Sequence, residues 1–592
     1  MRRGILLVAA WWVLSTAAIS FGQSKDLGAV VPTEYPLCIV TPNVAQAYGR
    51  YQATGVGKLF SSSAMAPFTA ELRKTGALSV ANWQGILGFD DKLLSGFSAP
   101  GVVMAVPAGK GEKGSIVFLI QTKKDDPAID ACLKSAESYL VTQKAKKTPS
   151  TLPGTTMAVV FDTPSSPDHP ALQHVYFYTE SGFFGVSSSL TAVKQYVGLK
   201  LTAANTLTAN TEFAAGRKQL KADSDLYIYS RPIETLELWE TPPKKGKTTG
   251  AKMANQGFKD LTAITAAVQF TGAAHDLDYQ AILFTKKPPY KKGMRMLQLS
   301  PGPEEKAPPF MIAGLGEMSQ FNHDQDVLYL ARANWYDELE VDGDDGAFLD
   351  IMDEIKRDKA VDFRKDVFGQ MKEAQIQAID VRGPAAPNNL LGRKNLKISE
   401  AKDPAAVVKA LTKFYEVDVK KGEVKFETVG GASIWWVTPP KPLLIDAKSA
   451  SGQQVNTMAV FGKYYIMAND TELVRKLVQN PGDFATDKVL ATLAAENRKL
   501  ETKGTGARTA IRWEDVWAAP FEAVRSADSK YDKENEVKML RSLLTGDSTL
   551  KYAALYKLLP PFSAAKPFLS PAGSVVDVVP DGLMLKGYIL KP

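Results

Sequence analysis

Short apolar runs alternate with segments of helical spacing along residues 24–287. The runs have strand length and are rich in β-branched and aromatic residues, and two of them flank a glycine-rich turn, which is typical of a β-hairpin. Asp126 and Pro127 open the longest helical segment, because aspartate caps free N–H groups and proline is tolerated in the first turn. A further helix is expected at 190–197. The expected strands are 37–40, 102–106, 116–120, 157–161, 175–178, 183–186, 263–270 and 279–284.

The same order of signals returns in residues 310–592. Asp403 and Pro404 open a helix with an apolar face, a hairpin turns at Gly462, and Asp470 marks the start of another helix. Each half ends in a long hairpin. The strands expected in this half are 434–437, 458–461, 464–467, 574–579 and 583–590.

This internal repeat predicts an α+β protein made of two diverged copies of one module. Each module is expected to contain mostly antiparallel hairpins with packed helices, the first at 24–287 and the second at 310–592. Residues 37–43 correspond to 328–334, and 126–128 to 403–405. Residues 288–309 are rich in proline, lysine and glutamate and are expected to form a linker. The modules are expected to share a sheet or to pack face to face.

Residues 1–22 are typical of an export signal peptide. Arg2 and Arg3 precede the uncharged apolar stretch 5–18, and small residues suit cleavage before Gln23. The apolar stretch is short for a membrane span, although an uncleaved anchor is the alternative. We expect the mature protein to lie outside the cytoplasm, in the periplasm, at the cell surface or in the medium, without an integral membrane span.

The two cysteines of the chain, Cys38 and Cys132, both lie in the first module. An exported protein meets an oxidising environment, so the pair is a candidate disulfide. Cys132 lies on the apolar face of the helix that Asp126 opens, and Cys38 lies in the first strand. The alternative is two buried, unreactive thiols.

The net charge of +7 is modest for 592 residues and does not predict a groove for nucleic acid. Lysines nevertheless cluster in loops rich in proline, glycine and threonine. Such loops are either simply solvated or make salt-sensitive contacts with acidic envelope polymers. The lysines concerned are Lys144, Lys146, Lys147, Lys244, Lys245, Lys247, Lys252, Lys286, Lys287, Lys291 and Lys292.

No motif of the chain predicts a cofactor or a catalytic residue. Residues 109–114 match a dinucleotide-binding glycine pattern, but a strand follows them where a helix is required, so we interpret them as a hairpin turn. Residues 96–100 come closest to a nucleophile elbow but end in proline.

An acidic run at 338–346 contains weak calcium-ligand candidates. Asp342, Asp344 and Asp345 offer the oxygen ligands that calcium prefers, but the glycine spacing departs from the standard calcium loop. A solvated turn is the alternative. The four histidines of the chain show no zinc-binding spacing.

The export signal, the repeated order of elements and the closing hairpin at 574–590 resemble a group of large exported bacterial proteins of planctomycete type, whose function is unknown. The resemblance implies export and the duplicated α+β module, and no site residues. Two hypotheses follow. The first is a non-enzymatic protein that binds or scaffolds in the cell envelope, using the basic loops, aromatics such as Trp435 or Trp436, or the cleft between modules. The second is a hydrolase or metal-dependent enzyme with a site between the modules.

Overall fold

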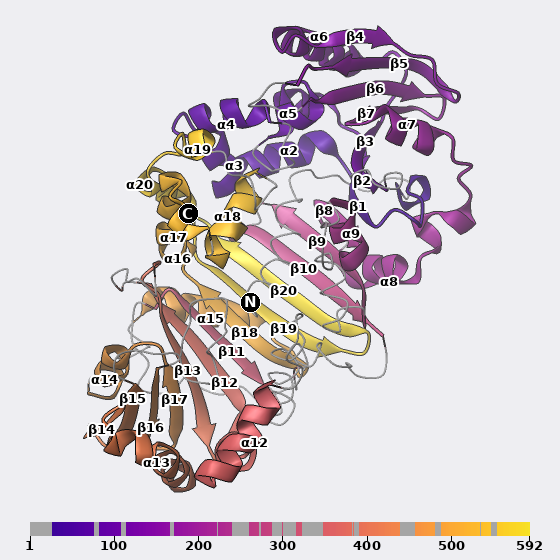
Figure 1. The fold of residues 1–592 in the computed structure, drawn as a ribbon. Coiled ribbons are helices and arrows are strands. Elements are labelled where there is room, and N and C mark those ends of the chain that lie inside the picture. The colour runs from indigo at the N-terminus through magenta and orange to yellow at the C-terminus, as the bar shows by residue number, and fades with distance from the viewer. Residues whose placement is uncertain are drawn as a thin grey trace.

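The computed structural model confirms the α+β class: helices pack on a large antiparallel sheet (Figure 1). It describes residues 27–592 except 76–81, 108–113, 166–170, 222, 240–259, 271–273, 287–298, 300–314, 323–346, 382, 384–389, 438–455, 480–486, 533 and 546–552. The predicted export signal and nearly all of the predicted linker therefore lie outside the described residues.

The strands of the first half lie in the order β4-β5-β6-β7-β3-β2-β1-β8-β9-β10, and every neighbouring pair is antiparallel. Local hairpins join β5 through β7, whereas β1 lies between two strands that are distant in sequence. The bounds are β1 Leu37–Thr41, β2 Gly101–Val106, β3 Ser115–Gln121, β4 Lys146–Pro149, β5 Thr155–Asp162, β6 Gln173–Thr179, β7 Phe183–Ser187, β8 Leu226–Ser230, β9 Leu261–Phe270 and β10 His275–Thr285.

The strands of the second half lie in the order β14-β15-β16-β17-β13-β12-β11-β18-β19-β20, again all antiparallel. Each strand number is ten higher than its counterpart, so the two halves have the same pairing order. The bounds are β11 Glu317–Asn322, β12 Met371–Asp380, β13 Lys394–Ala401, β14 Val424–Val429, β15 Ala432–Val437, β16 Thr457–Phe461, β17 Tyr464–Ala468, β18 Thr505–Ile511, β19 Ala572–Val579 and β20 Gly582–Leu590.

The halves share one sheet because their last strands pair with each other. β10 and β20 run antiparallel, from His275 opposite Leu590 to Phe284 opposite Gly582. In Figure 1 the yellow β20 lies beside the pink β10 at the centre of the molecule. The 20 strands in the described part of the chain therefore form one continuous sheet, whose outer edges are β4 and β14.

Helices pack on both faces of the sheet, and most of its strands bury apolar side chains on both sides. Successive side chains of a strand point to opposite faces. We name face A by Ile39, Leu283 and Leu583, and face B by Val40, Ile282 and Ile398. Face B carries α7 (Leu190–Val197), α8 (Thr211–Gln219), α14 (Thr471–Gln479) and α15 (Lys488–Leu500).

Face A carries the remaining long helices and two groups that differ between the halves. Towards the outer ends of the sheet lie α6 (Pro127–Thr142), α13 (Pro404–Lys420) and α12 (Ala347–Lys359). Near the centre lie four helices of the first half that follow β1 and precede β2 in the chain. They are α2 (Val44–Ala53), α3 (Gly55–Ser61), α4 (Ala66–Arg73) and α5 (Trp83–Leu87). The short α9 (Pro232–Trp239) also packs on this face.

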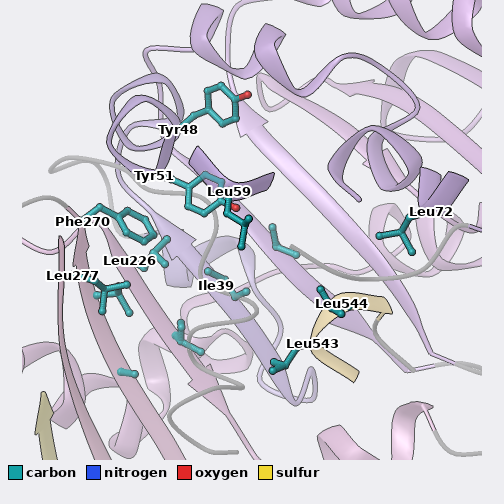
Figure 2. Close-up of a cluster of buried hydrophobic side chains, with 14 of the residues drawn as sticks. Ile39, Tyr48, Tyr51, Leu59, Leu72, Leu226, Phe270, Leu277, Leu543 and Leu544 are labelled. Atoms are coloured by element: carbon teal, nitrogen blue, oxygen red, sulfur yellow. The ribbon is translucent and has the colours of Figure 1, made fainter. Parts of the chain in front are cut away.

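The second half has its own helical group on this face, which follows β18 and precedes β19 in the chain. It comprises α16 (Trp513–Val516), α17 (Ala518–Ser526), α18 (Asn535–Thr545), α19 (Ala553–Tyr556), α20 (Phe562–Ala565) and the single turn η11 (Lys566–Phe568). We call α2–α5 and α16–η11 the two inserts. They meet on face A in one apolar cluster, and Figure 2 draws Leu543 and Leu544 of the second insert together with Leu59 and Leu72 of the first. α19 contacts α4, and η11 contacts α3.

The expected caps and hairpins are confirmed. The carboxylate of Asp126 accepts a hydrogen bond from Ala128 N at 2.9 Å, and that of Asp403 accepts one from Ala406 N at 3.0 Å. Asp470 caps α14 in the same way. The glycine-rich segment 109–114 connects β2 to β3, a strand, as the hairpin interpretation requires.

One correspondence of the predicted repeat, between residues 37–43 and 328–334, involves residues outside the described part of the chain. The strand with the pairing partners equivalent to those of β1 is β11, since β11 pairs with β12 and β18 as β1 pairs with β2 and β8. β11 was missed because its sequence, Glu-Met-Ser-Gln-Phe-Asn, lacks the apolar run of β1.

Candidate functional site

Most of the residues singled out for binding fall outside the described part of the chain. Lys286 is exposed just beyond β10, and its N–H donates to Asp260 O at 2.9 Å. Lys146 and Lys147 lie exposed on β4. Those outside are the calcium candidates Asp342, Asp344 and Asp345 and the lysines Lys244, Lys245, Lys247, Lys252, Lys287, Lys291 and Lys292.

The structure does not pair the two cysteines. Cys38 and Cys132 are both buried, and neither is joined in a disulfide. Cys38 points to face B from β1, whereas Cys132 projects from α6 into the cluster on face A. The sheet itself separates them, because strand alternation places Cys38 opposite to its neighbours Leu37 and Ile39. Burial raises the pKa of the Cys132 thiol to about 12, which keeps it protonated and unreactive.

Trp435 and Trp436 point to opposite faces of β15. Trp435 is buried in the face A cluster under α13. Trp436 lies on face B, where the guanidinium of Arg475 from α14 is 4.7 Å from its ring centroid. Helices therefore contact both rings, and neither forms an open aromatic surface.

A buried histidine fastens α5 to the sheet in the first half. His174 on β6 is 3% exposed, and its Nε2 lies 2.9 Å from Gly85 O. Tyr176, two residues along the strand, donates to Leu87 O at 2.8 Å. Burial lowers the pKa of His174, so the neutral ring donates to a carbonyl. This pair of contacts positions a helix.

Two buried carboxylates hold the first insert against the ends of β9 and β10. Asp225 Oδ1 lies 2.7 Å from Arg50 Nη1 of α2, and its Oδ2 accepts from Phe270 N at 2.7 Å. Asp276 on β10 accepts from Gly55 N, at the start of α3, at 2.8 Å. Burial raises the pKa of both carboxyls.

The group of polar side chains that most resembles an active site lies where the halves join. His275 on β10 places Nδ1 2.8 Å from Asp278 Oδ1 and Nε2 3.6 Å from Glu496 Oε2 on α15. Its ring stacks on Tyr588 of β20, with the centroids 4.6 Å apart. We call His275, Asp278, Glu496 and Tyr588 the junction cluster. It combines side chains from both halves on face B.

Each remaining member of the junction cluster is engaged in a packing or ionic contact. The hydroxyl of Tyr588 donates to Leu493 O at 2.8 Å, and its ring lies across Gly573, whose position leaves no room for a Cβ. Glu496 also pairs with Lys499 at 2.7 Å, and that hydrogen bond lowers the pKa of Glu496, with a further contribution from His275. The two ring nitrogens of His275 therefore face one carboxylate each, and the contact with Glu496 links β10 to α15. The arrangement therefore suits a contact between halves.

No sequence signal identified the junction cluster. Its members come from three elements, and the spacing of His275 and Asp278 is not that of one strand face, because a β-bulge lies between His275 and Leu277. Within the described ranges, no group of three His, Cys, Asp or Glu side chains is placed to hold a metal ion.

None of the described helices combines the length and apolar character needed to cross a membrane. Comparison with protein-family models, with curated proteins and with solved structures gave no match for this chain.

Proposed function

We propose that the protein is exported and acts outside the cytoplasm as a non-enzymatic scaffold or binding protein of the cell envelope. The observation that carries the proposal is the β10–β20 pairing, which joins two halves of equal pairing order into one continuous sheet. Helices cover both faces of that sheet, and its two ends lie far apart in the strand order. A continuous sheet of this kind is suited to binding one partner at each of its two ends.

The buried polar groups support the same proposal. His174, Asp225 and Asp276 each bond to the backbone of a neighbouring element, so their burial is explained by positioning helices and strand ends. The equal pairing order also supports the proposal that the two modules arose by duplication.

The alternative is a hydrolase or metal-dependent enzyme with a site between the halves. The junction cluster favours this alternative most directly, because a histidine beside a carboxylate is a common acid–base pair. Its weakness is that Tyr588 covers one face of the imidazole ring and Glu496 lies beside the second nitrogen.

Cell fractionation combined with crosslinking in intact cells tests the proposed function. We expect the protein in the envelope or the medium, shortened at the predicted cleavage point before Gln23, and crosslinked to envelope components. Recovery of uncleaved protein in the cytoplasm would contradict export. A hydrolase screen in which His275→Gln abolishes an activity of the wild type would favour the alternative.

The lysine and calcium hypotheses have separate tests. Lysine-driven binding predicts retention on an acidic polymer column and elution by moderate salt, since salt screens exposed charges. Absence of retention, or retention that survives high salt, would contradict it. Calcium binding near Asp342 predicts a thermal midpoint that falls when a chelator is added, and an unchanged midpoint would remove that hypothesis.

A further inference from the structure

The outer edge of the second half presents a strand with an exposed aromatic side chain. Among the described residues, β14 pairs only with β15, so its other edge has no strand partner. Phe426, at the middle of β14, is 48% exposed although it lies 5.2 Å from the ring of the buried Trp435. Val417 and Val419 of the contacting helix α13 are also exposed. Three of the six large apolar side chains found exposed in the described residues therefore lie on β14 and on the helix that contacts it, which favours an interaction at this end of the sheet.

The edge of the first half is built differently. β4 carries Lys146 and Lys147, both exposed, and ends at Pro149, which has no N–H to donate. Lysines and proline are the residues by which edge strands avoid pairing with other chains. β14 contains no proline, and its single lysine, Lys425, stands two positions from the acidic Glu427. The molecule therefore has one protected edge and one that is open to pairing.

The charges on β14 are complementary to themselves. Lys425 and Glu427 flank Phe426 and point to one face of the strand. In an antiparallel pair of two β14 strands centred on Phe426, Lys425 of each copy lies opposite Glu427 of the other. Opposite charges at directly facing positions stabilise such a pair, and the two Phe426 rings face each other on the other side.

We propose that β14 pairs with β14 of a second copy of this chain, in the register centred on Phe426, to form a two-fold symmetric dimer. A second copy fits better than an unrelated strand because the Lys-Phe-Glu order is its own complement. Two such strands form two opposite-charge pairs, one on each side of Phe426. A two-fold contact uses the same edge of both copies, so assembly closes at the dimer. Glu427 is held in place by Arg475 Nε at 2.6 Å, which presents the carboxylate at a fixed position. This inference goes beyond the proposed function and does not depend on where the protein resides.

Sedimentation and light scattering on the purified protein test the dimer. We expect the wild type to show a concentration-dependent monomer–dimer equilibrium. Phe426→Lys places two like charges face to face and is expected to raise the dissociation constant at least about tenfold. The matched control is Val141→Lys on α6, which is 61% exposed at the protected end of the sheet and is expected to leave the equilibrium unchanged.

A charge-swap experiment tests the register and does not depend on any one variant folding well. Lys425→Glu and Glu427→Lys each put like charges opposite each other in a homodimer, so each variant alone is expected to be monomeric. Mixed together, they restore both opposite-charge pairs and are expected to form a heterodimer, which also shows that both variants are folded. A monomeric wild type, growth beyond the dimer, dimers insensitive to Phe426→Lys, or failure of the mixed variants to associate would each overturn the proposal.

Discussion

The two halves of the molecule share a strand order, but their helical inserts follow different strands in the chain. In the first half the insert α2–α5 follows β1, whereas in the second the insert α16–η11 follows β18. Both inserts lie on face A and meet in one apolar cluster at the centre (Figure 2). On face B the equivalent helices α7 and α14, and α8 and α15, stay in separate clusters. The repeated strands thus provide the sheet and join the halves through β10 and β20, and the two inserts join the halves a second time on face A.

The largest effect is expected where the inserts touch. Leu555 on α19 is fully buried in the shared cluster, and α19 contacts α4 of the first half. Leu555→Ala is expected to lower the free energy of unfolding by about 2–5 kcal/mol, because the lost contacts leave a cavity. Hydrogen exchange should show weakened protection in α4 as well as in the second insert.

Leu477→Ala is the matched control for that variant. Leu477 on α14 is equally buried, but it belongs to the face B cluster of the second half. We expect a similar loss of stability without a selective change in α4. If both variants left α4 equally protected, the two inserts would not be coupled as the comparison requires.

A pair of glycines in the first insert sharpens the comparison at the level of single atoms. A Cβ on Gly55 would collide with the carbonyl oxygen of Phe568 in η11, so Gly55→Ala is expected to cost about 1–3 kcal/mol. A Cβ on Gly49 in α2 would meet no atom within 4 Å. Gly49→Ala is therefore expected to stabilise the helix by about 0.5–1 kcal/mol. Thermal unfolding of both variants checks the sign, and equal effects would contradict the close contact of the inserts.

The buried carboxylate that holds α3 gives a pH-dependent test. Burial raises the pKa of Asp276 above its ordinary value of 3.8. The folded protein therefore binds this proton more tightly than the unfolded chain. Its contribution to stability falls as pH rises from about 3.8 through the raised pKa of the folded state.

Asp276→Asn should remove this pH dependence, because an amide oxygen still accepts from Gly55 N but does not titrate. Unfolding midpoints are measured for both proteins at pH 4 and pH 7. The stability of the wild type relative to the variant should be greater at pH 4 than at pH 7. A difference that stays constant with pH would contradict a raised pKa.

Glu496 in the junction cluster is expected to show the opposite sign and the smallest effect. The ammonium of Lys499, with His275 beside it, lowers the pKa of Glu496 below its ordinary value of 4.5. Its stabilisation is therefore present above pH 4.5 and is lost as pH falls through the lowered pKa. Glu496→Gln should cost about 0.5–1 kcal/mol at pH 7, as expected for a partly exposed ion pair, and little at acidic pH. A cost that increased on acidification would contradict this assignment.

The sequence predicted those elements whose signals are local. The caps Asp126, Asp403 and Asp470 and the long closing hairpins are confirmed because a cap or a tight turn depends on residues only a few positions apart. β11 escaped prediction because its polar residues carry no apolar alternation, although it is buried between β12 and β18. The junction cluster and the contact of Gly55 with Phe568 escaped for a related reason: their members are distant in the chain.

By itself, the sequence determined the fold class, the repeated order of elements and the ends of many of them, since apolar periodicity, caps and turns act over a few residues. Only the tertiary structure decided that β10 and β20 join the halves edge to edge, that the sheet separates Cys38 from Cys132, and that the two inserts share one cluster. These outcomes depend on which strand edge pairs with which and on which face each side chain reaches. A change of one residue in register reverses that face, so composition and spacing cannot specify it alone.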